Sequence, residues 1–141
     1  MKYYLSLGTN LGRKEQNLQA ALKCIEEQIG NIVSLSAFHV TAPWGFTSAN
    51  SFLNAACCVQ TGLTPLQMLQ ATQRIERQLG RTHKSVNRIY ADRLIDIDLL
   101  LCFTDEGTPL TLNTPALTLP HPLMCERDFV MTPLREILPT V

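Results

Sequence analysis

The order in which strand and helix patterns follow one another is the feature that most constrains the fold of this chain. Alternating apolar residues predict strands, and apolar residues three and four positions apart predict helices. In chain order these patterns lie at residues 3–8 (strand), 18–29 (helix), 32–40 (strand), 52–61 (strand), 64–80 (helix) and 94–103 (strand). This β-α-β-β-α-β order predicts an α+β fold, a ferredoxin-like sandwich with two helices on one face of an antiparallel sheet. Turns, short extended pieces and one or two brief helices are expected as C-terminal extensions.

The second helix carries the clearest local signals. Thr64 can cap its start, Pro65 suits the first helical position, and Gln67 can complete a capping box. Gly80 is a helix stop. In the strand predicted over residues 32–40, one face is formed by Val33, Leu35, Ala37 and His39.

Composition limits the class of protein. A chain of 141 residues is the size of one domain, residues 1–141, and 45% hydrophobic with 17% charged residues is typical of a globular protein. Twelve basic residues balance twelve acidic ones, which argues against a binder of nucleic acid or membrane surfaces. Five cysteines without a Cys-x-x-Cys motif indicate reduced thiols and no zinc site. We expect a cytoplasmic protein and a monomer.

Two carboxylates share one face of the last predicted strand. Asp96 and Asp98 are two positions apart, which is about 6.6 Å along a strand, whereas Ile97 points to the other face. Both aspartates stay ionised only with water or a cation between them. Carboxylate oxygens completed by water and phosphate oxygens are the usual ligands of Mg²⁺. Two aspartates that merely face solvent would explain the same motif.

A basic segment precedes this strand. It holds six of the twelve basic residues of the chain, namely Arg74, Arg77, Arg81, Lys84, Arg88 and Arg93. A solvated helix face accounts for the first two. The others lie in a predicted loop, and a basic loop beside two carboxylates can neutralise a polyphosphate whose oxygens a metal bridges.

Further residues are suited to binding a flat heterocycle and a phosphate. Phe52, Phe129 and Trp44 can stack on a ring, and Asn54 can read its edge, although each aromatic can equally belong to the core or its rim. His121 lies between two prolines, where it serves either as a structural hydrogen-bonding group or as a phosphate contact.

With these residues assembled, the chain resembles the 6-hydroxymethyl-7,8-dihydropterin pyrophosphokinase family of folate biosynthesis. The resemblance runs nearly end to end. Its motifs are Gly8-Thr9-Asn10-Leu11-Gly12, Phe52-Leu53-Asn54-Ala55-Ala56, Gln73-Arg74-Ile75-Glu76, Gly80-Arg81, Asp92-Arg93-Leu94-Ile95-Asp96-Ile97-Asp98, Leu119-Pro120-His121-Pro122 and Arg127-Asp128-Phe129-Val130.

The resemblance implies an ATP-dependent diphosphotransferase. The two terminal phosphates of ATP pass as a unit to the hydroxymethyl group of the pterin, and AMP is released. It implies two Mg²⁺ ions held by Asp96 and Asp98, which with Arg81 and Arg93 form the catalytic set. The implied nucleotide contacts are Gln73, Glu76, Arg81, Tyr90, Arg93, His121 and Arg127. The implied pterin contacts are Thr41, Ala42, Pro43, Trp44, Phe52, Asn54 and Phe129.

Two other classes of protein remain as alternatives. A non-catalytic ferredoxin-like ligand-binding module would explain the fold, but it leaves the acidic strand beside a basic loop unexplained. Another metal-dependent phosphotransferase, such as a phosphoesterase or a nucleotidyl transferase, would need a poised water and often more acidic ligands than these two aspartates. The nucleotide product separates the three, because pyrophosphoryl transfer yields AMP, an ordinary kinase yields ADP, and a binding module yields neither.

Overall fold

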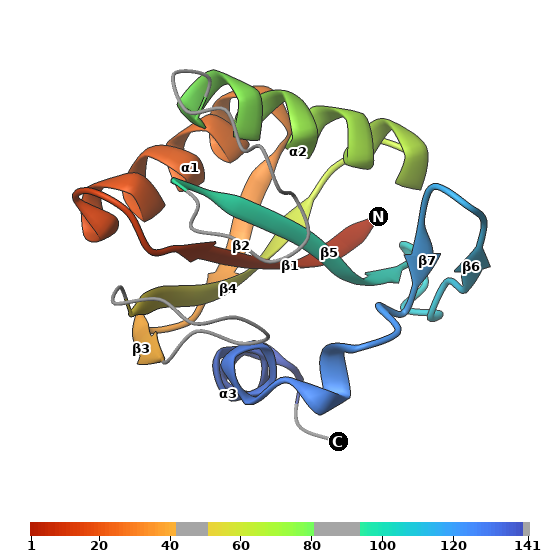
Figure 1. The fold of residues 1–141 in the computed structure, drawn as a ribbon. Helices are drawn as coiled ribbons and strands as arrows, with labels where there is room; N and C mark the ends of the chain where they lie inside the picture. Colours follow the sequence, from red (N-terminus) through yellow and green to blue (C-terminus); the bar gives the residue numbers. More distant parts are fainter. Residues whose placement is uncertain (42–50, 81–93, 140–141) are drawn as a thin grey trace.

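The computed structural model describes residues 1–41, 51–80 and 94–139. Its strands and helices follow the predicted order (Figure 1). They are β1 (Lys2–Thr9), α1 (Lys14–Gln28), β2 (Asn31–Leu35), β3 (His39–Thr41), β4 (Phe52–Gln60), α2 (Pro65–Gly80), β5 (Asp96–Phe103), β6 (Leu112–Asn113), β7 (Thr118–Leu119), the 3-10 helix η1 (Met124–Glu126) and α3 (Asp128–Ile137).

The main sheet is antiparallel, with strand order β2-β4-β1-β5 and with β3 paired to β4. Helices α1 and α2 cover one face, and α3 lies against the opposite face (Figure 1). This arrangement confirms the ferredoxin-like α+β fold and shows that the C-terminal extension supplies a third helix to the second face. None of the helices in the described ranges is long and apolar enough to span a membrane.

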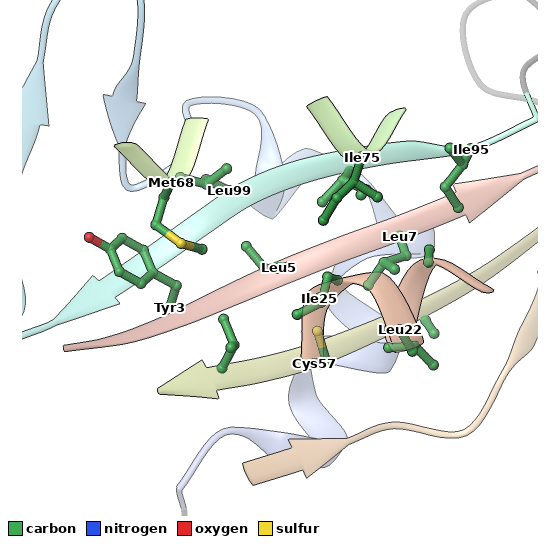
Figure 2. Packing of buried hydrophobic residues seen from close by; sticks show 14 of the residues in the cluster. Tyr3, Leu5, Leu7, Leu22, Ile25, Cys57, Met68, Ile75, Ile95 and Leu99 are labelled. Carbon is green, nitrogen blue, oxygen red and sulfur yellow. The ribbon is translucent and has the colours of Figure 1, made fainter. Parts of the chain in front are cut away.

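Alternation along the strands creates a core on each face of the sheet. Residues Tyr3, Leu5 and Leu7 of β1 are buried under α1 and α2, together with Ile25 and Ile75 of those helices (Figure 2). The intervening residues point to the other face, which we call the α3 face. There a smaller core is formed by Tyr4, Ala56, Cys58, Leu100, Val130 and Leu134. The α3 face is therefore only partly filled by apolar side chains.

A bulge in β5 determines which of its side chains reach the α3 face. Leu5 pairs with Leu99, whereas Tyr4 pairs with Leu101, so Leu100 is an extra residue. Leu100 and Leu101 both pack in the core of the α3 face. Before the bulge, the even-numbered residues of β5 point to this face, which places both aspartates there.

The single strand predicted over residues 32–40 is wrong, since β2 and β3 are separate. The chain turns at Ser36, which is buried and bonded to β4: the backbone N–H of Ala56 donates to Ser36 Oγ at 2.9 Å, and that of Ser36 donates to the Ala56 carbonyl. Val33 and Leu35 are 45% and 46% exposed, so the predicted apolar face of this strand points away from the core.

The predicted start of α2 is confirmed by both bonds of the capping box. The backbone N–H of Thr64 donates to Gln67 Oε1 at 2.9 Å, and that of Gln67 donates to Thr64 Oγ1 at 3.3 Å. The buried face of α2 is formed by Met68, Ala71, Thr72 and Ile75.

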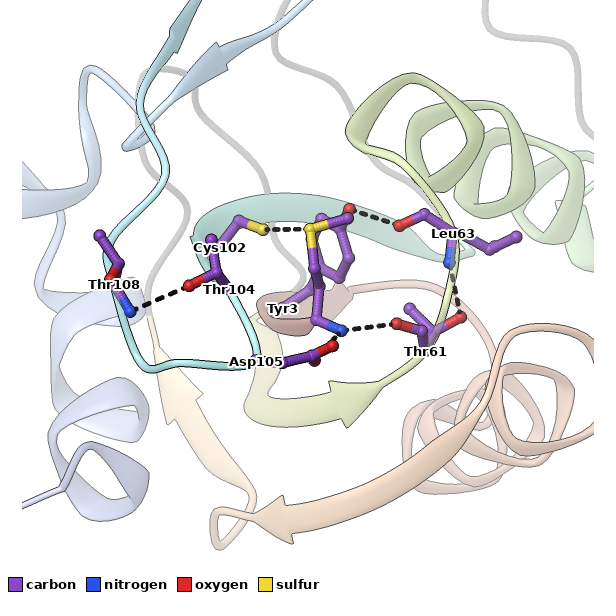
Figure 3. Close-up of polar contacts among 8 residues, drawn as sticks. Tyr3, Thr61, Leu63, Cys102, Thr104, Asp105 and Thr108 are labelled. Carbon is purple, nitrogen blue, oxygen red and sulfur yellow. Dashed lines mark hydrogen bonds and ion pairs between the residues drawn. The ribbon is translucent and has the colours of Figure 1, made fainter.

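Polar contacts at the opposite end of β5 from the aspartates join β1, β4 and the turn after β5 (Figure 3). The N-terminal ammonium donates to Asp105 at 2.8 Å and to the carbonyl of Thr61 at 2.9 Å. The hydroxyl of Tyr3 donates to the carbonyl of Leu63 at 2.7 Å, and burial raises the pKa of Tyr3 far above its ordinary value. These contacts hold the strands together at the end of the sheet that lies away from Asp96 and Asp98.

Candidate active site

The α3 face carries an amide and a carboxylate in a single row across three strands. Asn54 of β4 pairs with Gly8 of β1, and Gly8 pairs with Asp96 of β5. In the next row Asp98 pairs with Ser6. Neighbouring strands are about 4.8 Å apart, so the backbones of Asn54 and Asp96 are separated by about 10 Å. The residues predicted to bind the heterocycle and the metal therefore meet on one surface.

Gly8 leaves the space that the side chain of Asn54 occupies. A Cβ atom at position 8 would lie 2.8 Å from Asn54 Oδ1 and 3.6 Å from Phe52 Cδ1. Asn54 is only 2% exposed, and its Nδ2 donates to Thr41 Oγ1 of β3 at 2.5 Å. Glycine inside a strand commonly marks such a close approach. The structure thus brings together three predicted pterin contacts, Thr41, Phe52 and Asn54.

Asp96 and Asp98 are half-buried on the α3 face, whereas Ile97 and Leu99 are buried beneath α1 and α2. The predicted sharing of one face by the two aspartates is confirmed. Within the described residues, no group of three or more His, Cys, Asp or Glu side chains is arranged to hold a metal ion. A cation bound beside this pair would complete its coordination with water or phosphate oxygens.

Glu76 of α2 reaches the outer edge of β5, next to the aspartates. Its Oε2 accepts a hydrogen bond from the backbone N–H of Ile97 at 2.7 Å. Burial, together with the neighbouring charges of Asp96 and Asp98, raises the pKa of Glu76 to about 8, although the hydrogen bond from Ile97 acts in the opposite direction. Negative charge is thus concentrated at this place. Sequence reasoning missed this contact because it joins α2 to an edge strand twenty-one residues away.

His121 follows a cis Leu119–Pro120 peptide bond and is fixed by two backbone contacts. Its N–H donates to the carbonyl of Leu100 at 2.9 Å, and its Nδ1 accepts from the N–H of Leu123 at 3.2 Å. Burial lowers the pKa of His121, the charge of Arg127 lowers it further, and Asp96 opposes both. The ring is therefore neutral near pH 7, with its proton on Nε2. The charges of Arg127 and Asp96 both act on it.

Arg127 and Phe129 lie at the start of α3. Arg127 is the residue before the helix and is only 8% exposed. Its guanidinium carbon lies 5.7 Å from the centre of the Phe129 ring, which is cation–π distance. Phe129 is half-buried at the rim of the core on the α3 face. A buried cation and an aromatic ring thus occupy the same face as Asn54.

The remaining predicted contacts divide into two groups. Gln73 is exposed on α2, one turn before Glu76. The others lie outside the described residues, and these are Ala42, Pro43, Trp44, Arg81, Tyr90 and Arg93.

Comparison with known proteins decides the family. A family described as 7,8-dihydro-6-hydroxymethylpterin-pyrophosphokinase matches residues 4–139. The chain belongs to this family. A 2-amino-4-hydroxy-6-hydroxymethyldihydropteridine pyrophosphokinase from Porphyromonas gingivalis is 46% identical over 136 residues, covering 96% of this chain and 90% of that protein. The enzyme of that name from Bacillus subtilis is 36% identical, covering 95% and 76%.

Solved structures agree on the fold. A crystal structure of HPPK-DHPS in complex with substrates matches with a TM-score of 0.70 at 17% identity, covering 98% of this chain and 40% of that one. A Plasmodium falciparum HPPK-DHPS triple mutant matches equally well. Family membership confirms the resemblance noted in the sequence and the activity expected from it: the protein is an ATP-dependent diphosphotransferase of folate biosynthesis.

Proposed function

We propose that transfer of pyrophosphate from ATP to 6-hydroxymethyl-7,8-dihydropterin takes place on the α3 face. The observation that carries this proposal is the row Asn54–Gly8–Asp96, which sets a ring-reading amide about two strand spacings from a carboxylate. That distance allows the flat ring to lie over Asn54 while its hydroxymethyl group extends toward Asp96 and Asp98.

The pterin is held by stacking and by edge recognition. Phe52 and Phe129 supply aromatic faces, and the amide of Asn54, fixed by Thr41, supplies hydrogen bonds to the ring edge. The segment Thr41, Ala42, Pro43 and Trp44 completes this wall in our proposal. Because Asn54 is buried and already oriented, little side-chain entropy is lost when the ring binds.

Asp96 and Asp98 fit two Mg²⁺ ions by the chemistry of their oxygens. They are hard, half-exposed ligands on one face, and the raised pKa of Glu76 beside them marks a place that favours added positive charge. Held by Asp96 and Asp98, Mg²⁺ would supply positive charge that neutralises phosphate and lowers the pKa of a nearby hydroxyl. We therefore assign no separate general base.

The remaining groups position the triphosphate. In our proposal Arg81, Arg93 and Arg127 neutralise its oxygens, and neutral His121 donates from Nε2 to a phosphate oxygen. The family resemblance implies Gln73, Glu76 and Tyr90 as contacts of the nucleoside. In-line transfer depends mainly on such positioning and charge neutralisation, because the transition state spreads charge over the transferred oxygens.

Product analysis tests this function. The protein is incubated with ATP, Mg²⁺ and the hydroxymethylpterin, and the nucleotides are separated by anion exchange. We expect AMP and the pterin diphosphate in equal amounts, both dependent on the pterin. ADP as the product would indicate an ordinary kinase, and unchanged ATP would indicate a binding module.

Three wider expectations accompany the proposal. We propose that residues 1–141 act as one catalytic unit, that the protein works as a monomer, and that it is cytoplasmic. Size-exclusion chromatography with light scattering, at the concentration used for the assay, tests the second of these.

A further inference from the structure

Beside the aspartates, the outer edge of β5 is bonded by a side chain. β5 is the last strand of the main sheet in the described part of the chain, so within those residues no strand pairs with the outward backbone N–H groups at this end. The N–H of Ile97 is one of these, and it donates to Glu76 Oε2 at 2.7 Å. A carboxyl oxygen on α2 therefore accepts, at this edge, the hydrogen bond that a strand carbonyl would accept.

The position of that contact gives it a consequence for the site. Ile97 is the residue between Asp96 and Asp98, and its N–H belongs to the peptide that follows Asp96, so a bond to this N–H restrains the backbone that carries both side chains. Glu76 is also hydrogen-bonded to the side chain of Asp96. It therefore contacts the acidic pair both through the backbone and directly.

We propose that Glu76 is a positioning residue for the metal-binding pair, holding Asp96 and Asp98 in a fixed relation through the Ile97 amide. The inference rests on the proposed function, because it takes Asp96 and Asp98 as the metal ligands; Glu76, which the family resemblance places beside the nucleoside, is assigned instead to these ligands. Groups that orient metal ligands typically contribute a factor of about 10–100 in metal affinity or activity. Without this anchor, the edge of β5 would bond to water and the two carboxylates would separate more freely.

The opposite edge of the sheet offers a matched control. There Glu26 Oε2 accepts from the backbone N–H of Ile32 in β2 at 3.0 Å, so a helical glutamate again bonds an isoleucine amide of an edge strand. Glu26 is exposed and lies on α1, at the far edge from the aspartates. Its removal changes an edge contact of the same kind without touching the site.

Two substitutions at position 76, E76Q and E76D, distinguish the effect of side-chain length from the effect of the carboxyl group. E76Q keeps an oxygen for the Ile97 N–H and an N–H for Asp96, so it preserves both contacts without the carboxyl group. E76D keeps the carboxyl group but is one methylene shorter, so it cannot span to Ile97. Positioning predicts that E76Q recovers most of what E76A loses and that E76D resembles E76A.

The test is a Mn²⁺ titration followed by electron paramagnetic resonance, with a non-hydrolysable ATP analogue bound. We expect E76A and E76D to bind Mn²⁺ about 10–100-fold more weakly than the unmodified protein. E76Q and E26A should bind within a few-fold of it. The turnover number should follow the same order, whereas KM for the pterin should stay the same. If E76A does not fold, the comparison of E76D with E76Q decides the question.

Several results would overturn the inference. Equal Mn²⁺ affinity in E76A, E76D and the unmodified protein would show that Glu76 does not position the pair, and so would a loss in E76Q as large as in E76A. A loss of analogue binding without metal would assign Glu76 to the nucleoside. D96N is titrated alongside: if it also binds Mn²⁺ normally, the proposed function fails, whereas weak binding in D96N with normal binding in E76A rejects only the role of Glu76.

Discussion

Gly8 shows how the absence of one side chain shapes this site. The Cβ atom of an alanine there would lie 2.8 Å from Asn54 Oδ1, so the amide would have to move. A misplacement of about 1 Å can cost roughly a hundredfold in rate, and we expect G8A to raise KM for the pterin by about tenfold to a hundredfold. Steady-state kinetics with saturating ATP measures this change.

Gly62 is the matched control, because a Cβ atom there would meet nothing within 4 Å. G62A should leave KM for the pterin at its original value. Equal effects of G8A and G62A would show that the space at position 8 is unrelated to pterin binding.

Substitution of Phe129 tests, also at the scale of one residue, whether an aromatic ring stacks on the pterin. Truncation to alanine removes an aromatic face from the rim of the α3 face, and we expect pterin binding to weaken by about 1–3 kcal/mol. Titration calorimetry measures this loss. F103A is the control, since Phe103 packs edge-on against Tyr4 with ring centres 5.8 Å apart, away from the aspartates. F103A should lower stability and keep pterin affinity, and the reverse pattern would place the ring elsewhere.

At the scale of elements, α3 connects two parts of the proposed pterin site, the Phe129 ring and strand β3. Phe129 lies in its first turn, and Glu136 in its last turn accepts from the backbone N–H of Ala37 at 2.9 Å and bonds His39 Nε2. His39 is in β3 and pairs with Asn54. The helix therefore holds the bend between β2 and β3, which in turn carries Thr41 to the amide of Asn54.

The pH dependence of this contact has a definite sign. The Ala37 N–H is the main group that lowers the pKa of Glu136 below its ordinary value of 4.5, and His39 lowers it further. A carboxyl whose pKa is lowered by folding stabilises the fold above its unfolded pKa, and the stabilisation is lost as the pH falls through the folded value. E136A should therefore reduce the melting temperature more at pH 7 than at pH 3. An equal reduction at both values, or the same profile in the exposed control E126A, would contradict this role.

The start of α2 is a second test at this scale. T64A removes one bond of the capping box and should lower the free energy of unfolding by about 1 kcal/mol, whereas T64S keeps the hydroxyl and should lose less. Urea denaturation followed by circular dichroism measures both variants. Identical unfolding curves for T64A and the unmodified protein would mean that the cap contributes nothing.

For the molecule as a whole, the reactivity of the cysteine thiols shows whether the sheet remains folded. Cys57 lies in the core of β4, and burial raises its pKa to about 12. Cys125 is exposed in η1. At pH 7.5 a disulfide reagent should modify Cys125 rapidly and Cys57 only after unfolding, because the reactive species is the thiolate. Mass spectrometry of timed samples checks this, with C125S as the control, and early labelling of Cys57 would contradict a tightly closed core.

The element order could be predicted from the sequence because each pattern is local. The capping box at Thr64 and the alternation through Asp96 and Asp98 need only neighbouring residues to be recognised. The turn at Ser36 could not be predicted, since it depends on two bonds to Ala56, twenty residues further along the chain. The extra residue at Leu100 likewise appears only when the register with β1 is known.

For the site too, some features could be predicted from local sequence and others could not. The residue types of the pterin wall and the acidic pair could be recognised in the sequence, including Phe52, Asn54 and Asp96. Strand register places Asn54 and Asp96 in one row. The contact of Glu76 with Ile97 depends on the packing of α2 beside the edge strand β5. Such relations between distant segments have no local signature.

The rate of AMP formation in aspartate variants is the most direct test of whether Asp96 and Asp98 hold the metal ions for transfer. D96N and D98N each replace one proposed metal ligand by a near-isosteric amide, whereas D105N changes an exposed aspartate at the other end of β5. We expect D96N and D98N to lose about a thousandfold or more in turnover, equivalent to several kcal/mol of transition-state stabilisation, while D105N keeps its rate. AMP formation at the unmodified rate in D96N and D98N would contradict this role of the two aspartates.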